Sequence, residues 1–198
     1  MSDKILTVPN LLTLVRMGLI PVFASLLYYG KYEWALFAFF FAGVSDGIDG
    51  FVARRFNQSS SLGTILDPIA DKLLMTTAFI LLTLPHVLPE SNKHFPVPFW
   101  VTASVIGRDV LIVVVALAIF MMTEFRGFKP SIWGKVSTFV QISCVGFVLI
   151  ACIFPSYSGW YLPPVYTLTT ALAFISGIHY IFHVAMLMNE EKKEEAKT

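Results

Sequence analysis

Four aspartates stand at close spacing in an apolar part of the chain. Asp46 and Asp49 are three residues apart, and Asp67 and Asp71 are four residues apart. At about 100° per residue, each pair falls on one face of a helix. Carboxylates this close repel one another unless cations intervene, and an all-oxygen set suits Mg²⁺ or Mn²⁺. The spacing therefore predicts a site for hard divalent cations.

Small residues and one arginine share these helix faces. Gly50, Ala53 and Arg54 share an arc of about 140° of one helix with the first acid pair, and Gly63 shares an arc of about 80° of the next helix with the second. Missing side-chain bulk lets a flat base or a diphosphate approach the backbone, and an arginine can clamp an anionic oxygen. These features indicate phosphate chemistry. The alternatives are close helix packing for the small residues and a structural charge network with Arg54 and Lys72 for the acids.

The elements that must position these residues are membrane helices. The chain has 198 residues, is 56% hydrophobic and 14% charged, and has a mean hydropathy of +0.72. Soluble domains are about 25% charged, and a chain this short cannot bury such an apolar excess. At about 20 residues per span, we expect one all-α integral membrane domain over residues 1–198, ending in a polar tail at 190–198. Its six transmembrane helices are expected at Leu11–Tyr29, Trp34–Phe56, Leu62–Leu84, Phe99–Met122, Ile132–Phe154 and Val165–Met188.

Basic residues are unevenly distributed between the two ends of these spans. One side collects Lys4, Arg54, Arg55, Arg126, Lys129, Lys135, Lys192, Lys193 and Lys197, and the other side has Lys31 and Lys93. The bias predicts that both termini are cytoplasmic. Because the second and third spans are antiparallel neighbours, both acid pairs should lie near their cytoplasmic end. We expect a bacterial inner membrane protein whose active site faces the cytoplasm. The net charge of +1 is too small to create the positive electrostatic field that would attract nucleic acid.

Further charged residues fall inside the expected spans. A charge at a helix centre costs about 2.5–3.5 kcal/mol on insertion scales, so each one is a functional hypothesis. Arg108 in the fourth span and Lys135 at the start of the fifth predict a second anion site. Arg16 in the first span can be interpreted in the same two ways, as part of an anion site or as a structural charge. Such a site favours an acceptor that carries its own phosphate. Alternatively, Arg108 pairs with a carboxylate and Lys135 snorkels to the interface.

Two histidines and two cysteines carry weaker signals. His179 and His183 lie one turn apart and could ligate a metal, but no third ligand accompanies them in that segment. We interpret them as hydrogen-bonded residues near a helix end. Cys144 and Cys152 are too far apart along a helix to form a disulfide, so we expect small core residues.

The acidic constellation has the form of a known signature. From Asp46 to Asp71 the chain reads Asp-x2-Asp-Gly-x2-Ala-Arg-x8-Gly-x3-Asp-x3-Asp, which resembles the signature of the CDP-alcohol phosphotransferase family at every fixed position. The resemblance extends over the whole chain in length and in the number of helices. It implies transfer of a phosphatidyl group from CDP-diacylglycerol to an alcohol, with release of CMP.

The resemblance also implies roles for individual residues. Two Mg²⁺ or Mn²⁺ ions would be held by Asp46, Asp49 and Asp67, and Asp71 would be the general base and a further metal contact. The CDP site would contain Asn10, Gly50, Ala53, Arg54 and Gly63. The acceptor phosphate would meet Arg108, Lys135 and Arg16. Many family members are homodimers, so a homodimer is expected.

Two compounds are candidates for the acceptor alcohol. The segment from Val8 to Arg16, together with Arg108 and the run Gly134-Lys135-Val136, resembles the small phosphatidylglycerophosphate synthases and the CMP-forming cardiolipin synthases. We expect glycerol 3-phosphate as the acceptor, with phosphatidylglycerol as the alternative. The run Gly107-Arg108-Asp109 resembles cardiolipin synthases of the eukaryotic type, whereas many phosphatidylglycerophosphate synthases have glutamate at the last position.

A cation transporter is the remaining alternative, with the four aspartates binding an ion in passage. Transporters place such sites near the membrane midplane on broken helices of repeated halves. Here the acids lie toward one end of their helices, so we favour the enzyme.

Overall fold

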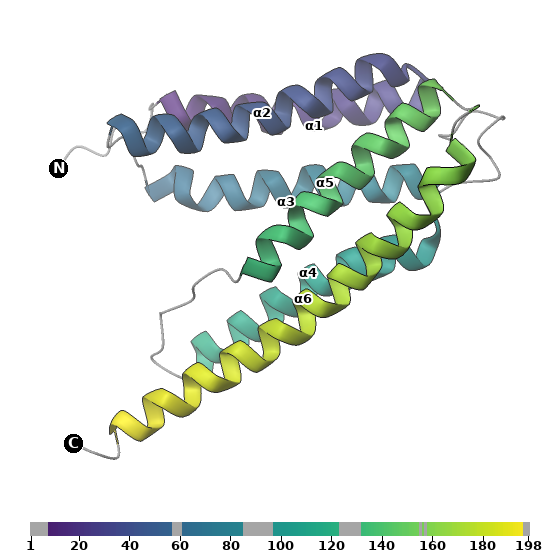
Figure 1. Ribbon diagram of the computed structural model, residues 1–198. Helices are drawn as coiled ribbons and strands as arrows, with labels where there is room; N and C mark the ends of the chain where they lie inside the picture. Colours follow the sequence, from purple (N-terminus) through teal and green to yellow (C-terminus); the bar gives the residue numbers. More distant parts are fainter. Residues whose placement is uncertain are drawn as a thin grey trace. The chain divides into compact units, whose positions relative to one another are not determined.

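The computed structural model describes residues 8–56, 61–84, 97–122, 132–154, 156 and 158–195. These residues form six helices and no strand (Figure 1). The helices are α1 Val8–Tyr28, α2 Tyr32–Phe56, α3 Ser61–Thr83, α4 Phe99–Met122, α5 Ile132–Ile153 and α6 Ser158–Glu195. The expected all-α fold is confirmed.

The turn between α1 and α2 is fixed by Gly30. This residue has a φ of 69°, a left-handed conformation that glycine adopts without steric cost. The Gly30 N–H donates to the Leu27 carbonyl (3.0 Å), and the Lys31 N–H donates to the Leu26 carbonyl (2.8 Å). This pair of bonds is a Schellman motif, which satisfies carbonyls at the end of α1. The chain then reverses, and α2 begins at Tyr32.

The chain divides into two compact units. The first comprises residues 1–97 and 145–159, and the second comprises residues 98–144 and 160–198. In the first unit, α1 packs along both α2 and α3 (Figure 1). Its core contains Phe23 and Phe39, whose ring centroids are 5.8 Å apart, and the fully buried Leu27 and Leu82. This unit carries the whole acidic motif.

The second unit contains α4, the first part of α5 and α6 from Trp160 onward. Figure 1 shows α4 and α6 side by side. The Ser104 and Thr170 hydroxyls are hydrogen-bonded between these two helices, with an oxygen separation of 3.2 Å. The helix α5 is continuous, but its residues up to Cys144 belong to the second unit and those from Val145 belong to the first.

The helices have the composition of a membrane bundle. Among the described residues, the segments Phe99–Ala118, Ile132–Ile153 and Gly159–Met186 are long and apolar enough to cross a membrane. The segments Thr13–Tyr28 and Tyr32–Ser45 are shorter apolar helices. Many large apolar side chains are exposed, as expected for surfaces that face lipid. The expected class, an integral membrane protein of six helices, agrees with this arrangement.

The last helix differs from the sequence-based expectation. We expected a span at Val165–Met188 followed by a polar tail from 190, whereas α6 begins at Ser158 and continues to Glu195. Pro163 and Pro164 suggested a break, but both lie within the first two turns of α6. Pro163 and Pro164 are the sixth and seventh residues of α6, beyond the first four N–H groups, so each removes one backbone hydrogen bond without ending the helix.

Candidate active site

The acidic motif lies on two consecutive helices of the first unit. Every residue of the motif from Asp46 to Asp71 that the structure describes is helical, with the first acid pair on α2 and the second on α3. Only four residues separate the end of α2 from the start of α3. A connection this short keeps the acid-bearing ends of the two helices near each other. The side chains of Asn10, Asp46, Asp49, Gly50, Ala53, Arg54 and Gly63 lie outside the part that the structure describes.

The second acid pair is half-buried on α3 and is joined to α1. The Thr13 hydroxyl donates a hydrogen bond to Asp67 Oδ1, and Thr13 itself is fully buried. One donated hydrogen bond orients a carboxylate and leaves its other lone pairs available. Carboxylates that bind metals are commonly supported in this way. Asp71 lies one turn further along α3, also half-buried.

Thr13 was not predicted from the sequence as a site residue. A signal was available, because Asn10, Thr13 and Arg16 recur every three residues in an otherwise apolar helix and so form a polar stripe. The structure shows Thr13 and Arg16 buried together on α1.

Arg16 is placed in the first unit, with the acidic motif. Its side chain is only 1% exposed and is among the largest fully buried side chains. Arg108 and Lys135, which we grouped with it at the acceptor phosphate, belong to the second unit. Burying a guanidinium is costly unless an anion compensates its charge. Arg16 therefore contributes a buried positive charge to the unit that holds the aspartates.

Arg108 is buried on α4 within a set of hydrogen bonds. Its Nη1 donates to Asp109 Oδ1 at 2.8 Å. Its Nε and Nη2 both donate to Ser176 Oγ on α6, at 3.3 and 2.9 Å, and Nη2 also donates to the Gly134 carbonyl of α5 at 3.4 Å. The carboxylate pairing that we considered as an alternative for Arg108 is therefore present in the structure.

Lys135 follows directly after the glycine whose carbonyl meets Arg108. The backbone at the start of α5 thus lies beside this arginine, while the Lys135 side chain is exposed. Ser176 was missed in the sequence, although it lies seven residues after Thr169 and both are 1% exposed. Two buried hydroxyls at this spacing mark one polar line along α6.

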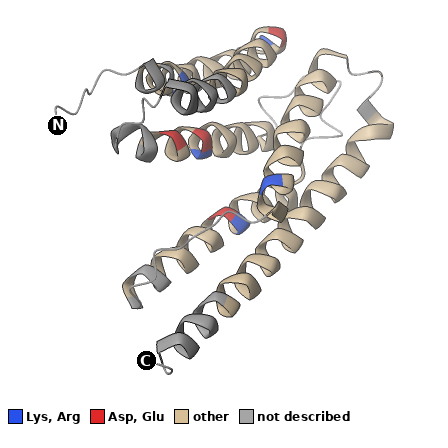
Figure 2. Ribbon diagram, turned by 60° about the vertical axis from the view of Figure 1, so that its left-hand side comes forward, with Lys and Arg blue, Asp and Glu red and all other residues tan. Residues whose placement is uncertain are grey.

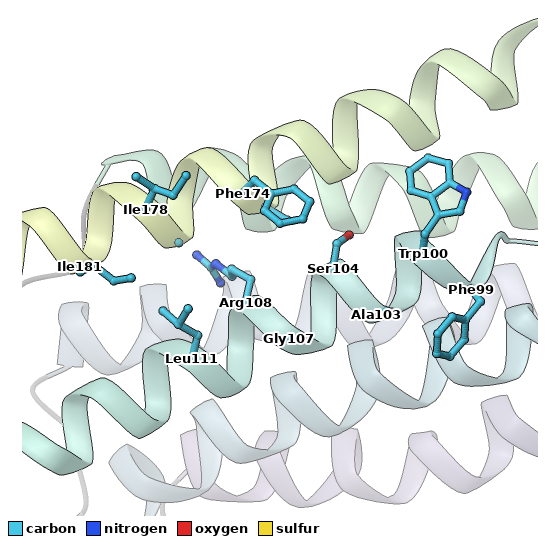
Figure 3. Close-up of a pocket in the computed structure, with 12 residues that line it drawn as sticks. Phe99, Trp100, Ala103, Ser104, Gly107, Arg108, Leu111, Phe174, Ile178 and Ile181 are labelled. Carbon is cyan, nitrogen blue, oxygen red and sulfur yellow. The ribbon is translucent and has the colours of Figure 1, made fainter.

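A cavity of about 460 Å³ lies between α4 and α6, next to Arg108 (Figure 3). Among the described residues that line it, Arg108 is the only charged one. A Cβ atom at Gly107 would meet nothing within 4 Å, so this glycine borders open space. The other walls are largely apolar, with Phe99, Trp100, Phe174 and Ile178 among them. Such a lining suits hydrocarbon more than a polar head group.

Charged groups are sparse on the described helices. Where side chains are described, Figure 2 shows the acidic and basic positions as short coloured stretches on an otherwise tan ribbon. Among the described residues, no group of three or more histidine, cysteine or acidic side chains is arranged to hold a metal ion. Two of the four predicted metal ligands, Asp46 and Asp49, have side chains outside that part.

The paired histidines of α6 pack as rings. The centroids of His179 and His183 are 6.0 Å apart with nearly parallel planes, and Trp133 of α5 lies 6.4 Å from His179. The buried Nδ1 of His179 makes no hydrogen bond within the described residues. Cys144 and Cys152 are buried free thiols, as predicted.

The comparisons with known proteins cover nearly the whole chain. The family model for CDP-alcohol phosphatidyltransferase matches residues 6–188. A probable phosphatidylglycerophosphate synthase of Mycobacterium tuberculosis is 32% identical over 90% of this chain and 81% of its own length. The CDP-diacylglycerol--glycerol-3-phosphate 3-phosphatidyltransferase of Pseudomonas fluorescens is 36% identical over 79% of this chain and 78% of its own length.

Proteins named for a different product, cardiolipin, are similar to about the same extent. The probable cardiolipin synthase (CMP-forming) of Drosophila melanogaster is 31% identical over 92% of this chain. The chain spans 61% of the length of that protein. The family model covers both helices that carry the acidic motif and both units. The chain therefore belongs to the CDP-alcohol phosphatidyltransferase family.

Proposed function

We propose that this protein transfers the phosphatidyl group of CDP-diacylglycerol to glycerol 3-phosphate, giving phosphatidylglycerophosphate and CMP. Membership of the family already places the protein in phospholipid biosynthesis. The observation that carries the proposal is the complete acidic motif on two consecutive helices, with Asp67 held by Thr13. The names of the Mycobacterium tuberculosis and Pseudomonas fluorescens relatives support this acceptor.

Two divalent metal ions are assigned to the four aspartates, Asp46, Asp49, Asp67 and Asp71. The donor chemistry fits, because Mg²⁺ and Mn²⁺ prefer carboxylate oxygens. The Thr13 hydroxyl occupies one lone pair of Asp67 Oδ1 and leaves the others for a cation. When bound, the ions neutralise the donor diphosphate and make its β-phosphorus electrophilic.

The chain's own residues then handle the proton and the leaving group. Asp71 takes the proton of the acceptor hydroxyl as that oxygen attacks the β-phosphorus in line, at hydrogen-bond distance. The bond between this phosphorus and the CMP oxygen breaks, and CMP leaves. Arg54 binds a diphosphate oxygen, while Gly50, Ala53 and Gly63 let the nucleotide approach the helix backbone and Asn10 contributes from α1.

The acceptor phosphate is assigned to Arg108 and Lys135, together with Arg16. These are basic groups in an apolar setting, and a phosphate is the anion that a guanidinium binds in bidentate fashion. The placement of Arg108 next to the start of α5 supports a joint role with Lys135.

Cardiolipin synthesis, with phosphatidylglycerol as acceptor, is the second candidate. The apolar cavity beside Arg108 favours it, since an acyl chain of a lipid acceptor would suit that lining. The names of the relatives from Drosophila melanogaster and Rattus norvegicus point the same way.

The setting of the reaction is also a proposal. We place the protein in a bacterial inner membrane as a single-domain homodimer, with both termini and the active site facing the cytoplasm. The head groups of both substrates require water, whereas their acyl chains require access to lipid between the helices.

A direct assay compares the two acceptors. Purified protein in detergent is given CDP-diacylglycerol and Mg²⁺ with either glycerol 3-phosphate or phosphatidylglycerol, and released CMP is measured. We expect CMP release with glycerol 3-phosphate. Release with phosphatidylglycerol alone would establish the second candidate, and release with neither from folded protein would contradict both.

A further inference from the structure

We infer that Ser176 and Asp109 determine how Arg108 binds the acceptor phosphate. Ser176 fixes one edge of the guanidinium, and Asp109 occupies the nitrogen that the phosphate must take over. The inference rests on the proposed function, in which Arg108 contacts the acceptor. Ser176 is thus a positioning residue, and Asp109 is a residue that determines specificity.

Ser176 holds the edge of the guanidinium that Nε and Nη2 form. Both nitrogens donate to the one oxygen of Ser176, at 3.3 and 2.9 Å, and Nη2 also reaches the Gly134 carbonyl at 3.4 Å. The guanidinium is planar, so a partner that bridges two of its nitrogens fixes the orientation of the whole group. Ser176 is 1% exposed, and water is therefore a poor substitute for it. Figure 3 shows the Arg108 side chain lying between α4 and α6.

The Nη1 nitrogen of Arg108 is paired with Asp109. Its acceptor is Asp109 Oδ1 at 2.8 Å, and the two side chains are only 7% and 14% exposed. An ion pair that is shielded from water is weakly screened, so an uncharged ligand cannot replace the carboxylate without a large loss. A phosphate can replace it, because phosphate supplies the negative charge and accepts the same hydrogen bond.

The consequence is discrimination against acceptors that lack a phosphate. With Ser176 holding Nε and Nη2, Nη1 is the nitrogen that can change partner, from the Asp109 carboxylate to the acceptor phosphate. An alcohol without a phosphate would have to break the ion pair and leave both charges uncompensated. Asp109 thus acts as an internal competitor that only an anionic acceptor displaces.

The test of Ser176 uses a hydroxyl from the same helix pair as its control. Ser176→Ala removes the bridging oxygen and is expected to raise the acceptor KM by about three- to tenfold, with the KM for CDP-diacylglycerol unchanged. Ser176→Thr, which keeps the hydroxyl, should restore the acceptor KM. Ser104→Ala also removes a hydroxyl contact between α4 and α6, but in the described contacts this hydroxyl bonds Thr170 and not the Arg108 guanidinium. It should leave both KM values unchanged, and an equal rise in Ser104→Ala and Ser176→Ala would overturn the positioning role.

Replacing Asp109 is expected to change the acceptor KM in the opposite direction, downward. Asp109→Asn keeps an oxygen acceptor but removes the competing charge, so the acceptor KM should fall by about three- to tenfold. The rate with unphosphorylated glycerol, relative to glycerol 3-phosphate, should rise. A higher acceptor KM in this variant would overturn the competitor role. Asp109→Ser carries the same expectation and is used if Asp109→Asn does not elute as folded protein in size-exclusion chromatography.

Different results would contradict the proposed function and the roles of Ser176 and Asp109. Wild-type protein that releases no CMP with any acceptor contradicts the proposed function and, with it, this inference. Wild-type protein that is active, together with variants whose acceptor KM does not move, contradicts the inference alone.

Discussion

At the scale of single residues, the site depends on which group a helix hydroxyl bonds. Ser25 and Ser143 donate to carbonyls four residues earlier in their own helices, at 2.8 and 2.9 Å. Thr13 instead donates across to Asp67 on α3. A hydroxyl that bonds its own helix has a local effect, whereas one that reaches a carboxylate orients it. Thr13 should therefore influence metal binding without touching a substrate.

Replacing Thr13 with valine tests this role. Thr13→Val keeps the shape of the side chain but removes the hydrogen bond to Asp67, so the apparent affinity for Mg²⁺ should fall about tenfold or more. The measurement is CMP release as a function of Mg²⁺ concentration. Ser25→Ala is the matched control, because it removes a hydroxyl of the same helix that bonds only the Pro21 carbonyl in the described contacts. An unchanged Mg²⁺ dependence in Thr13→Val would refute the supporting role.

The aspartates of this site were predictable from the sequence, whereas the hydroxyls that support it were not identified. The carboxylates could be predicted, since an acid inside an apolar span is expensive and needs a reason. Thr13 and Ser176 were missed: their spacing from other polar residues indicates a polar helix face, but most hydroxyls of a membrane helix can bond their own backbone, and the sequence does not tell which one faces a charged partner. The motif spacing predicts a shared helix face, but not that α1 supplies the hydrogen bond to Asp67.

At the scale of the elements, boundaries were predictable where polar or turn residues interrupt the apolar pattern. The ends of α2, α3, α4 and α5 lie within two residues of those expected. The predicted start of α6, at Val165, was wrong. The proline pair that we interpreted as a break lies inside the helix. The turn after α1 was predictable from Gly30, whose positive φ explains why glycine stands there.

Two glycines of α1 and its turn should respond to alanine with opposite signs. Gly30→Ala forces a Cβ into the left-handed region and should destabilise the protein by about 1 kcal/mol. Gly18→Ala lies inside α1, where a Cβ would meet nothing within 4 Å, and should stabilise it by about 0.5–1 kcal/mol. Thermal unfolding in detergent measures both. A Gly30→Ala variant at least as stable as Gly18→Ala would contradict this account of the turn.

At the scale of the whole molecule, the proposed orientation follows from the distribution of lysine and arginine. Both termini are assigned to the cytoplasm because basic residues gather on that side. The two native cysteines are buried, which makes them poor targets for a reagent that cannot cross membranes.

Cysteine labelling in oriented vesicles tests this topology. Lys193→Cys should react with an impermeant maleimide only in inside-out vesicles, and Lys93→Cys only in right-side-out vesicles. The unmodified protein provides the background from Cys144 and Cys152. Labelling of both positions from the same side would contradict the assignment of six spans with both termini together.

The central claim is that the acidic motif transfers a phosphatidyl group, with Asp71 as the base. Its most direct test is CMP release by Asp71→Asn from CDP-diacylglycerol and glycerol 3-phosphate, measured beside binding of the CDP-lipid. Glu33→Gln, at an exposed acid of the first turn of α2, is the control and should be fully active. We predict that Asp71→Asn loses turnover by about a hundredfold or more while it still binds CDP-diacylglycerol. Turnover close to that of the control would contradict the account.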